Sequence, residues 1–159
     1  MPAAQLVPFF SALRRFWRLP GSERSIVLQS AFWLTTTWFA LRLIGFRRWS
    51  GFLERSSAVV NATANPSQLA EARNITRLLS AAASHIFVRT NCLEQAMALS
   101  CVLRRRGIPA QLRFGARKDS SRLEAHAWVE HLGIPLNEDR GEHLHFLPFE
   151  NQQRESLTD

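Results

Sequence analysis

Four residues in the second half of the chain could together perform thiol chemistry: Cys92, His126, Glu138 and Asp139. A cysteine thiolate can attack a carbonyl carbon, and a histidine within reach can hold that thiolate as an ion pair and later protonate the leaving amine. A carboxylate can fix the tautomer of the imidazole. The residue types and their order in the chain therefore predict a nucleophilic Cys-His-acid triad.

The segment around Cys92 has clear helix boundaries. Asn91 is a good N-cap, Glu94 stands three residues on as its reciprocal capping partner, arginines 104–106 fill the last turn, and Gly107 suits a left-handed C-terminal position. Cys92 is then the first residue of the helix. There, free backbone amides and the positive end of the helix dipole favour the thiolate form and can donate to a developing oxyanion.

After this helix, hydrophobic residues recur at every second position, which is the spacing typical of a strand. Alternation over residues 108–117 predicts a first strand, residues 118–121 a turn, and residues 123–130 a second strand. In the second strand, Leu123, Ala125, Ala127 and Val129 share one face, and Glu124, His126, Trp128 and Glu130 share the other. Leu132 and Gly133 reverse the chain into a short third strand over 134–137.

Two neighbouring acids, Glu138 and Asp139, are candidates for the third member of the triad. If Leu132 and Gly133 are the two central residues of a tight hairpin, His126 faces Asp139 and Glu138 points away. A longer connection or a bulge shifts the register by one residue and brings Glu138 nearer instead. Both acids are therefore candidates.

Both cysteines also have a purely structural interpretation. A cysteine in a helix is often a small buried hydrophobe, which is one alternative for Cys92 and the prediction for Cys101. Cys101 stands nine residues further along the same helix, too far to form a disulfide with Cys92. His126, taken alone, could equally be a packing residue.

Metal and cofactor sites have little support in the sequence. His143 and His145 would share a strand face and could bind a metal with Cys92 or His131, but no second close ligand pair has zinc-site spacing. No glycine-rich phosphate loop is present. We therefore expect neither a metal nor a cofactor.

The sequence predicts one compact domain with two parts. Residues 1–60 form an N-terminal helical region, and residues 67–159 form the catalytic core. An uncharged run from Ile26 to Leu41 is too short to span a membrane and predicts a buried or interfacial helix. Its apolar face is expected at Val27, Ala31, Leu34, Trp38, Leu41 and Gly45. Asn65-Pro66 marks a turn between the two parts, and a helix is expected from Ser67 to about His85.

The formal net charge of +7 comes almost entirely from the first 60 residues, where eight arginines face Glu23 and Glu54. Four tryptophans accompany these arginines: Trp17, Trp33, Trp38 and Trp49. This composition is typical of a helix resting on lipid headgroups, and it also fits core packing beside a solvated arginine face. Two cysteines and no leader-like start predict a cytoplasmic protein, with peripheral membrane contact as an additional expectation.

The run from Asn91 to Glu138 resembles the transglutaminase-like cysteine peptidases of lasso-peptide biosynthesis. The matching motifs are CLEQA, LRRRGIPAQLRFG, AHAWVE and LNE, and a weaker likeness continues through the N-terminal helices and the closing FLPFE. The resemblance implies an α+β, papain-like or transglutaminase-core fold, with N-terminal helices and a nucleophile helix packed on a small antiparallel sheet.

The resemblance also implies an activity, namely removal of the leader from a ribosomally made precursor peptide before macrolactam cyclisation. It implies Cys92 as nucleophile and His126 as general base. The family typically has Asp twelve residues after the histidine, whereas this chain has Glu138 there, followed by Asp139. The expected partners are the precursor peptide, a separate leader-recognition protein and an ATP-dependent macrolactam cyclase.

Three alternatives accompany this hypothesis. A scaffold of the same fold could hold peptide without catalysis, and the same triad could transfer the acyl group to an amine instead of water. The positive charge could also indicate a nucleic-acid binder, but no recognisable nucleic-acid-reading motif is present, so we expect no nucleic acid as partner.

Overall fold

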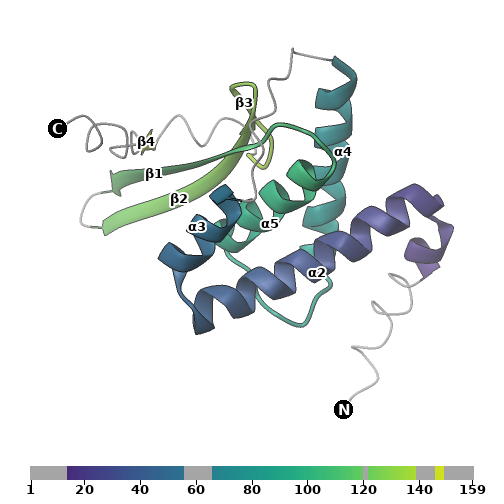
Figure 1. Cartoon of the computed structure of the whole chain (residues 1–159), viewed down its shortest axis with the longest axis horizontal. Coiled ribbons are helices and arrows are strands. Elements are labelled where there is room, and N and C mark those ends of the chain that lie inside the picture. The colour runs from purple at the N-terminus through teal and green to yellow at the C-terminus, as the bar shows by residue number, and fades with distance from the viewer. Residues whose placement is uncertain (1–13, 56–65, 120–121, 139–145, 149–159) are drawn as a thin grey trace.

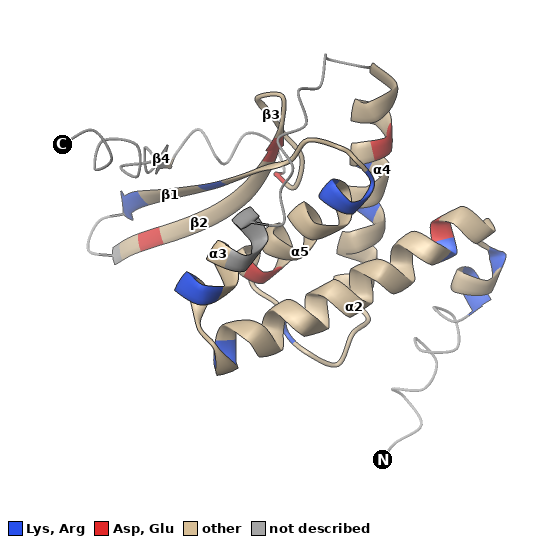
Figure 2. Ribbon diagram, viewed as in Figure 1, with Lys and Arg blue, Asp and Glu red and all other residues tan. Residues whose placement is uncertain are grey.

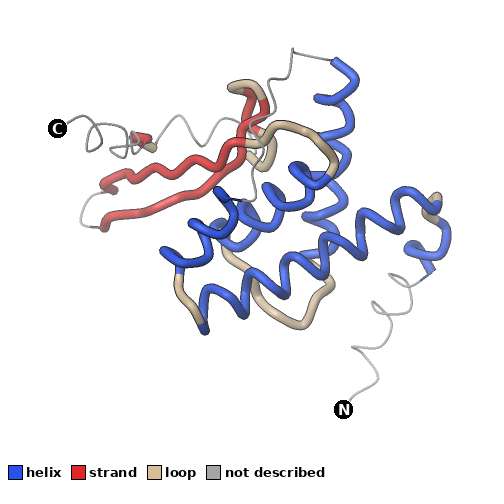
Figure 3. Tube along the Cα trace, in the orientation of Figure 1, coloured by secondary structure: helices blue, strands red, loops and turns tan. Residues whose placement is uncertain are grey.

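The computed structural model describes residues 14–55, 66–119, 122–138 and 146–148. Its elements, apart from a helical segment at 14–18, are helices α2 (Gly21–Leu43), α3 (Phe46–Arg55), α4 (Pro66–Ala83) and α5 (Cys92–Arg105), and strands β1 (Gln111–Asp119), β2 (Arg122–His131), β3 (Ile134–Pro135) and β4 (Leu147–Pro148) (Figure 1). The strands form one antiparallel sheet in the order β3-β2-β1-β4. Helices and sheet form separate layers (Figure 3), which confirms the predicted α+β class.

Helix α2 packs on both α4 and α5 through one face. Its buried residues are Ile26, Ser30, Leu34 and Thr37, at the spacing of a single helical face. The predicted helix is confirmed, but the predicted face is displaced. Of the six expected positions only Leu34 is fully buried, and Gly45 lies beyond the helix with a φ of +79°. None of the helices in the described ranges is long and apolar enough to cross a membrane.

The tryptophans of the N-terminal region do not form one surface. Trp49 is buried beside Met97 and Cys101, and Trp33 packs against the core with the Arg105 guanidinium 5.5 Å from its ring centroid. Trp17, by contrast, is 64% exposed. Core packing therefore accounts for Trp33 and Trp49.

The main core forms where α2, α4 and α5 meet the sheet. From α4 it takes Ala72, Ile75, Leu78, Leu79 and Ala82, from α5 Ala96, Ala98, Leu99, Val102 and Leu103, and from β2 Ala127 and Val129. Helix α4 thus confirms the helix expected from Ser67, although it ends at Ala83 instead of His85. The boundary expected between 60 and 67 lies largely outside the described residues, so the division of the chain stays a prediction.

The strands depart from the alternation pattern at their ends. Strand β1 begins at Gln111 instead of Ile108. Pro109 has no N–H to donate to a neighbouring strand, and the Ala110 carbonyl accepts two hydrogen bonds from the Arg104 guanidinium, at 3.0 and 3.1 Å. Leu123, expected on the buried face, is 76% exposed next to the turn of the β1–β2 hairpin. The alternation holds only where helices cover the sheet.

Candidate active site

Cys92 is the first residue of α5, as predicted, and its side chain is partly buried. The complete capping box fixes this position. The Asn91 side chain accepts from the Glu94 backbone N–H at 3.1 Å, and Glu94 Oε2 accepts from the Asn91 backbone N–H at 2.7 Å. The thiol therefore lies at a rigid and electropositive helix end.

The capping box leaves two donors beside the sulfur. A helix has four N-terminal amides without partners inside it, and here the cap occupies those of Asn91 and Glu94. Within the described part of the chain, no backbone bond is made by the amides of Cys92 or Leu93. These two N–H groups are available to an oxyanion at the thiol.

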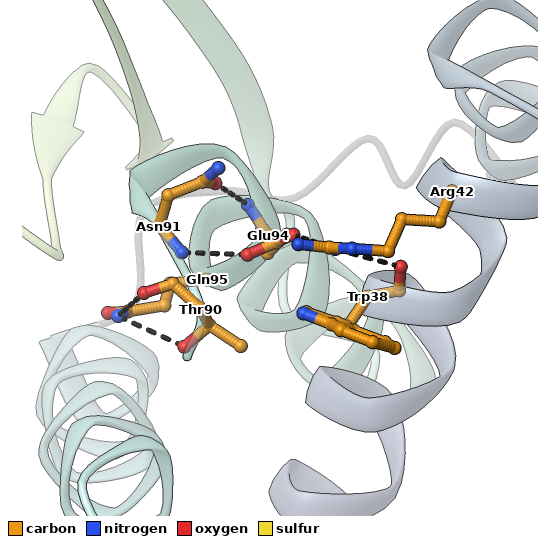
Figure 4. A network of polar contacts seen from close by, with 6 residues as sticks. All are labelled: Trp38, Arg42, Thr90, Asn91, Glu94 and Gln95. Carbon is orange, nitrogen blue, oxygen red and sulfur yellow. Dashed lines mark hydrogen bonds and ion pairs between the residues drawn. The ribbon is translucent and has the colours of Figure 1, made fainter. Parts of the chain in front are cut away.

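Glu94 also ties the nucleophile helix to α2 (Figure 4). Its carboxylate is buried, with 3% of the side chain exposed, and pairs with the Arg42 guanidinium at 2.7 Å. That guanidinium lies 3.9 Å from the Trp38 ring centroid and donates to the Trp38 carbonyl at 3.2 Å. No sequence pattern predicts this link, and its one signal is that Arg42 ends the uncharged run of α2.

We expect Glu94 to contribute strongly to stability. Glu94→Gln keeps an oxygen for the capping box and removes the ionic partner of Arg42, so it should lower the free energy of unfolding by about 1 kcal/mol. Glu94→Ala removes cap and ion pair together and should cost about 2–4 kcal/mol. Urea denaturation measures both changes.

Arg77→Gln is the matched control for this comparison. Arg77 also reaches across to α2, but it contacts Glu23 at 3.6 Å and its side chain is 63% exposed. Exposed pairs contribute little, so the control should cost less than about 1 kcal/mol. Equal effects of Glu94→Ala and Arg77→Gln would contradict a strong contribution of Glu94 to stability.

His126 lies on β2 and its imidazole is held on several sides. Its Nε2 is in hydrogen-bond contact with Glu138 Oε1, and the exposed fractions of the two side chains are 20% and 2%. The ring stacks on Trp128 at a centroid distance of 6.1 Å and lies 5.1 Å from Phe146. A buried carboxylate on Nε2 leaves Nδ1 as the nitrogen open to a reacting group.

The β2–β3 turn explains why Glu138 reaches His126. Leu132 and Gly133 both have positive φ, 53° and 78°, and form the predicted two-residue hairpin, with Glu130 opposite Pro135. The prediction that this hairpin would turn Glu138 away is wrong. The ladder ends early, because the Asn137 side chain, instead of backbone, accepts from the Val129 N–H at 2.7 Å. Asp139 lies outside the described residues.

Within the described residues, no hydrogen bond joins the Cys92 thiol to His126. Ala127 and Val129, which alternate with His126, are the β2 residues of the main core, so the imidazole projects from the opposite face of the strand. Strand β3 pairs only with Glu130 and His131, which leaves the edge of β2 beside His126 without a strand among the described residues.

Among the side chains that the structure describes, no three His, Cys, Asp or Glu residues are grouped as metal ligands. His143 and His145 lie outside the described residues. His131 is buried, with its Nδ1 2.7 Å from the Pro109 carbonyl oxygen, which is a structural contact.

Cys101 is a core residue, as predicted. It is 5% exposed and packs with Trp49 and Met97. Burial raises the pKa of its thiol to about 12, although the nearby Arg104 and Arg105 charges act in the opposite direction. Since the thiolate is the nucleophilic form, Cys101 is inert near neutral pH.

Alkylation should separate the two cysteines. Near pH 8, a thiol with a pKa of about 12 is ionised in roughly one molecule in ten thousand. Iodoacetamide should therefore label Cys92 in the folded protein and reach Cys101 only after unfolding in urea, as followed by peptide mass spectrometry. Labelling of Cys101 at the same rate in folded and unfolded protein would contradict its burial.

Comparison with known proteins adds one match. A sequence model of the family described as "Transglutaminase-like superfamily" matches residues 33–151, about three quarters of the chain. The matched region includes about half of α2 and all of α5 and the sheet. No match was found among curated proteins or solved structures.

Proposed function

Because the chain belongs to the transglutaminase-like superfamily, we propose that it is a cysteine peptidase that removes the leader from a lasso-peptide precursor. Cys92 is the nucleophile, His126 the general acid and base, and Glu138 the residue that orients His126. The observation that carries this assignment is the contact of His126 Nε2 with a carboxylate that is almost fully buried.

This contact suits the proposed role of the imidazole. A buried carboxylate that accepts from Nε2–H holds one tautomer and stabilises the imidazolium that forms when the thiol loses its proton. Nδ1 is then the nitrogen that exchanges the proton with the thiol. The superfamily match supports cysteine chemistry in general, and the motifs between Asn91 and Glu138 support the leader-peptidase assignment.

The reaction proceeds in two balanced steps. The Cys92 thiolate attacks the carbonyl carbon at the leader–core junction, the amides of Cys92 and Leu93 stabilise the oxyanion, and the C–N bond breaks as the imidazolium protonates the core amine. Water then gives a proton to His126 and attacks the thioester. The C–S bond breaks, the leader leaves as a carboxylic acid that gives its proton to solvent, and the Cys92 thiolate and His126 imidazolium are restored.

The freed core amine is the group that an ATP-dependent macrolactam cyclase would acylate with an acidic side chain of the core. We propose this cyclase and a separate leader-recognition protein as partners. The assay therefore combines the purified protein with a lasso precursor and leader-recognition protein from the same genomic neighbourhood, and follows free leader and core by mass spectrometry. An added amine distinguishes acyl transfer from hydrolysis, because transfer gives a leader amide.

The second candidate function is a non-catalytic scaffold that holds the precursor peptide. Two observations favour it: the lack of a Cys92–His126 hydrogen bond among the described residues, and the projection of His126 from the β2 face opposite the core. Catalytic hydrogen bonds in substrate-free enzymes are often long and tighten only when substrate binds. Precursor binding without any cleavage, even with the recognition protein present, would favour the scaffold.

A further inference from the structure

The outer face of α2 carries a row of exposed apolar side chains, which we call the α2 stripe: Leu28, Phe32, Phe39 and Leu43. They are 61%, 62%, 50% and 79% exposed. Their spacing of four, seven and four residues places them on one side of the helix, opposite the face that packs on α4 and α5. Helix α2 is thus apolar on two sides, and the described elements pack on only one of them.

Exposed apolar residues are concentrated in this region. Of eleven exposed large hydrophobic side chains in the described part of the chain, seven lie between Trp17 and Phe46. The α2 stripe alone extends over about 22 Å of helix. Isolated exposed apolar residues are ordinary, whereas a continuous row marks an interaction surface.

Charge at the two ends of the α2 stripe indicates the partner. Exposed Arg14, Arg15 and Arg18 precede α2, and exposed Arg47 and Arg48 follow it (Figure 2). Glu23 is the only acidic residue between positions 14 and 51, and it lies 3.4 Å from Asn74 and 3.6 Å from Arg77 on α4. The stripe therefore lies between two groups of cations and has no acidic residue of its own.

We infer that the α2 stripe docks on an anionic lipid surface, with α2 parallel to the membrane plane. The leucine and phenylalanine side chains enter the acyl boundary, and the flanking arginines reach the headgroup phosphates. The opposite side of α2 stays in the protein core, so lipid contacts one face of the helix only. This inference goes beyond the proposed peptidase activity and does not depend on it.

A uniform anionic layer fits this surface better than a protein groove does. The exposed apolar side chains lie along one helix, and the cations lie at both of its ends, about as far apart as the helix is long. A bilayer of anionic lipids offers phosphate along that whole length and an apolar layer beneath it. A protein partner would need an apolar groove with acidic residues at both ends.

Vesicle co-sedimentation of the full chain tests the inference. The probes are neutral phosphatidylcholine vesicles and vesicles with equal parts phosphatidylcholine and phosphatidylglycerol. Wild type should bind the anionic vesicles preferentially. Phe32→Ser/Phe39→Ser should lower that partition coefficient by about tenfold or more, and Arg47→Gln/Arg48→Gln by about fivefold or more.

The matched control is Leu123→Ser/Leu132→Asn, which removes two exposed leucines, at 76% and 46%, from the sheet hairpins and should bind like wild type. Circular dichroism checks folding, and Leu28→Ser/Leu43→Ser replaces the phenylalanine variant if that one does not fold. Failure of folded wild type to bind anionic vesicles, or equal binding to both vesicles, overturns the inference. Self-association that the stripe variants abolish, without vesicle binding, assigns the stripe to a second copy and also overturns it.

Discussion

Cys92→Ala should lower the rate of leader cleavage by at least about 10³-fold, with folding and precursor binding retained. The thiolate forms the covalent intermediate, so its removal leaves only binding and the oxyanion donors. The alanine side chain fits the same first position of α5, and the capping box between Asn91 and Glu94 does not involve the sulfur. The loss should appear in kcat and not in the affinity for the precursor.

Cys101→Ala is the control for this result. Cys101 is buried in the core and its thiol is protonated near neutral pH, so its loss should change cleavage by less than about threefold and cost about 1 kcal/mol of stability. Product formation by the two variants is compared by mass spectrometry at equal protein concentration. Cleavage by Cys92→Ala at the wild-type rate would exclude Cys92 as nucleophile.

Glu138→Gln should lower kcat by about 10²- to 10⁴-fold with KM nearly unchanged. Glutamine has almost the shape of glutamate, but it lacks the negative charge that stabilises an imidazolium, and its NH₂ group can reverse the hydrogen bond to Nε2. In the proposed mechanism Glu138 acts through its contact with His126, so it is a positioning residue. The pH dependence of kcat should change in Glu138→Gln, and Glu138→Asp should restore part of the rate, whereas a purely structural residue would alter stability alone.

Asp139→Asn is the matched control, since it makes the same chemical change at the neighbouring acid. We expect it to retain cleavage within about threefold of wild type, because Glu138 already occupies Nε2 of His126. A larger loss in Asp139→Asn than in Glu138→Gln would reverse the assignment and make Asp139 the orienting carboxylate.

The nucleophile helix could be predicted in detail because its signals are local. Asn91 and Glu94 are three residues apart and form the capping box that their types predict. Gly107 has the left-handed φ, +71°, that the end of the helix requires. Short-range hydrogen bonds of this kind depend on neighbouring residues alone, so the sequence contains all the information that determines them.

Other features depend on residues far apart in the chain. The Arg42–Glu94 pair joins residues 52 positions apart, and no local pattern indicates it. Because α2 has apolar residues on both sides, its packing on α4 and α5 determines which side is buried. Glu138 is placed at His126 because the pairing of β2 with β3 ends early. There the Asn137 side chain replaces a backbone carbonyl as the acceptor for the Val129 N–H.

The proposed function requires that His126 activates Cys92, and alkylation kinetics test this most directly. The second-order rate of iodoacetamide labelling at Cys92 is measured near neutral pH in wild type, His126→Ala and Glu138→Gln. We predict fast labelling of wild type, a fall of about tenfold or more in His126→Ala and a smaller fall in Glu138→Gln. Equal and slow labelling in all three proteins would contradict an activated nucleophile.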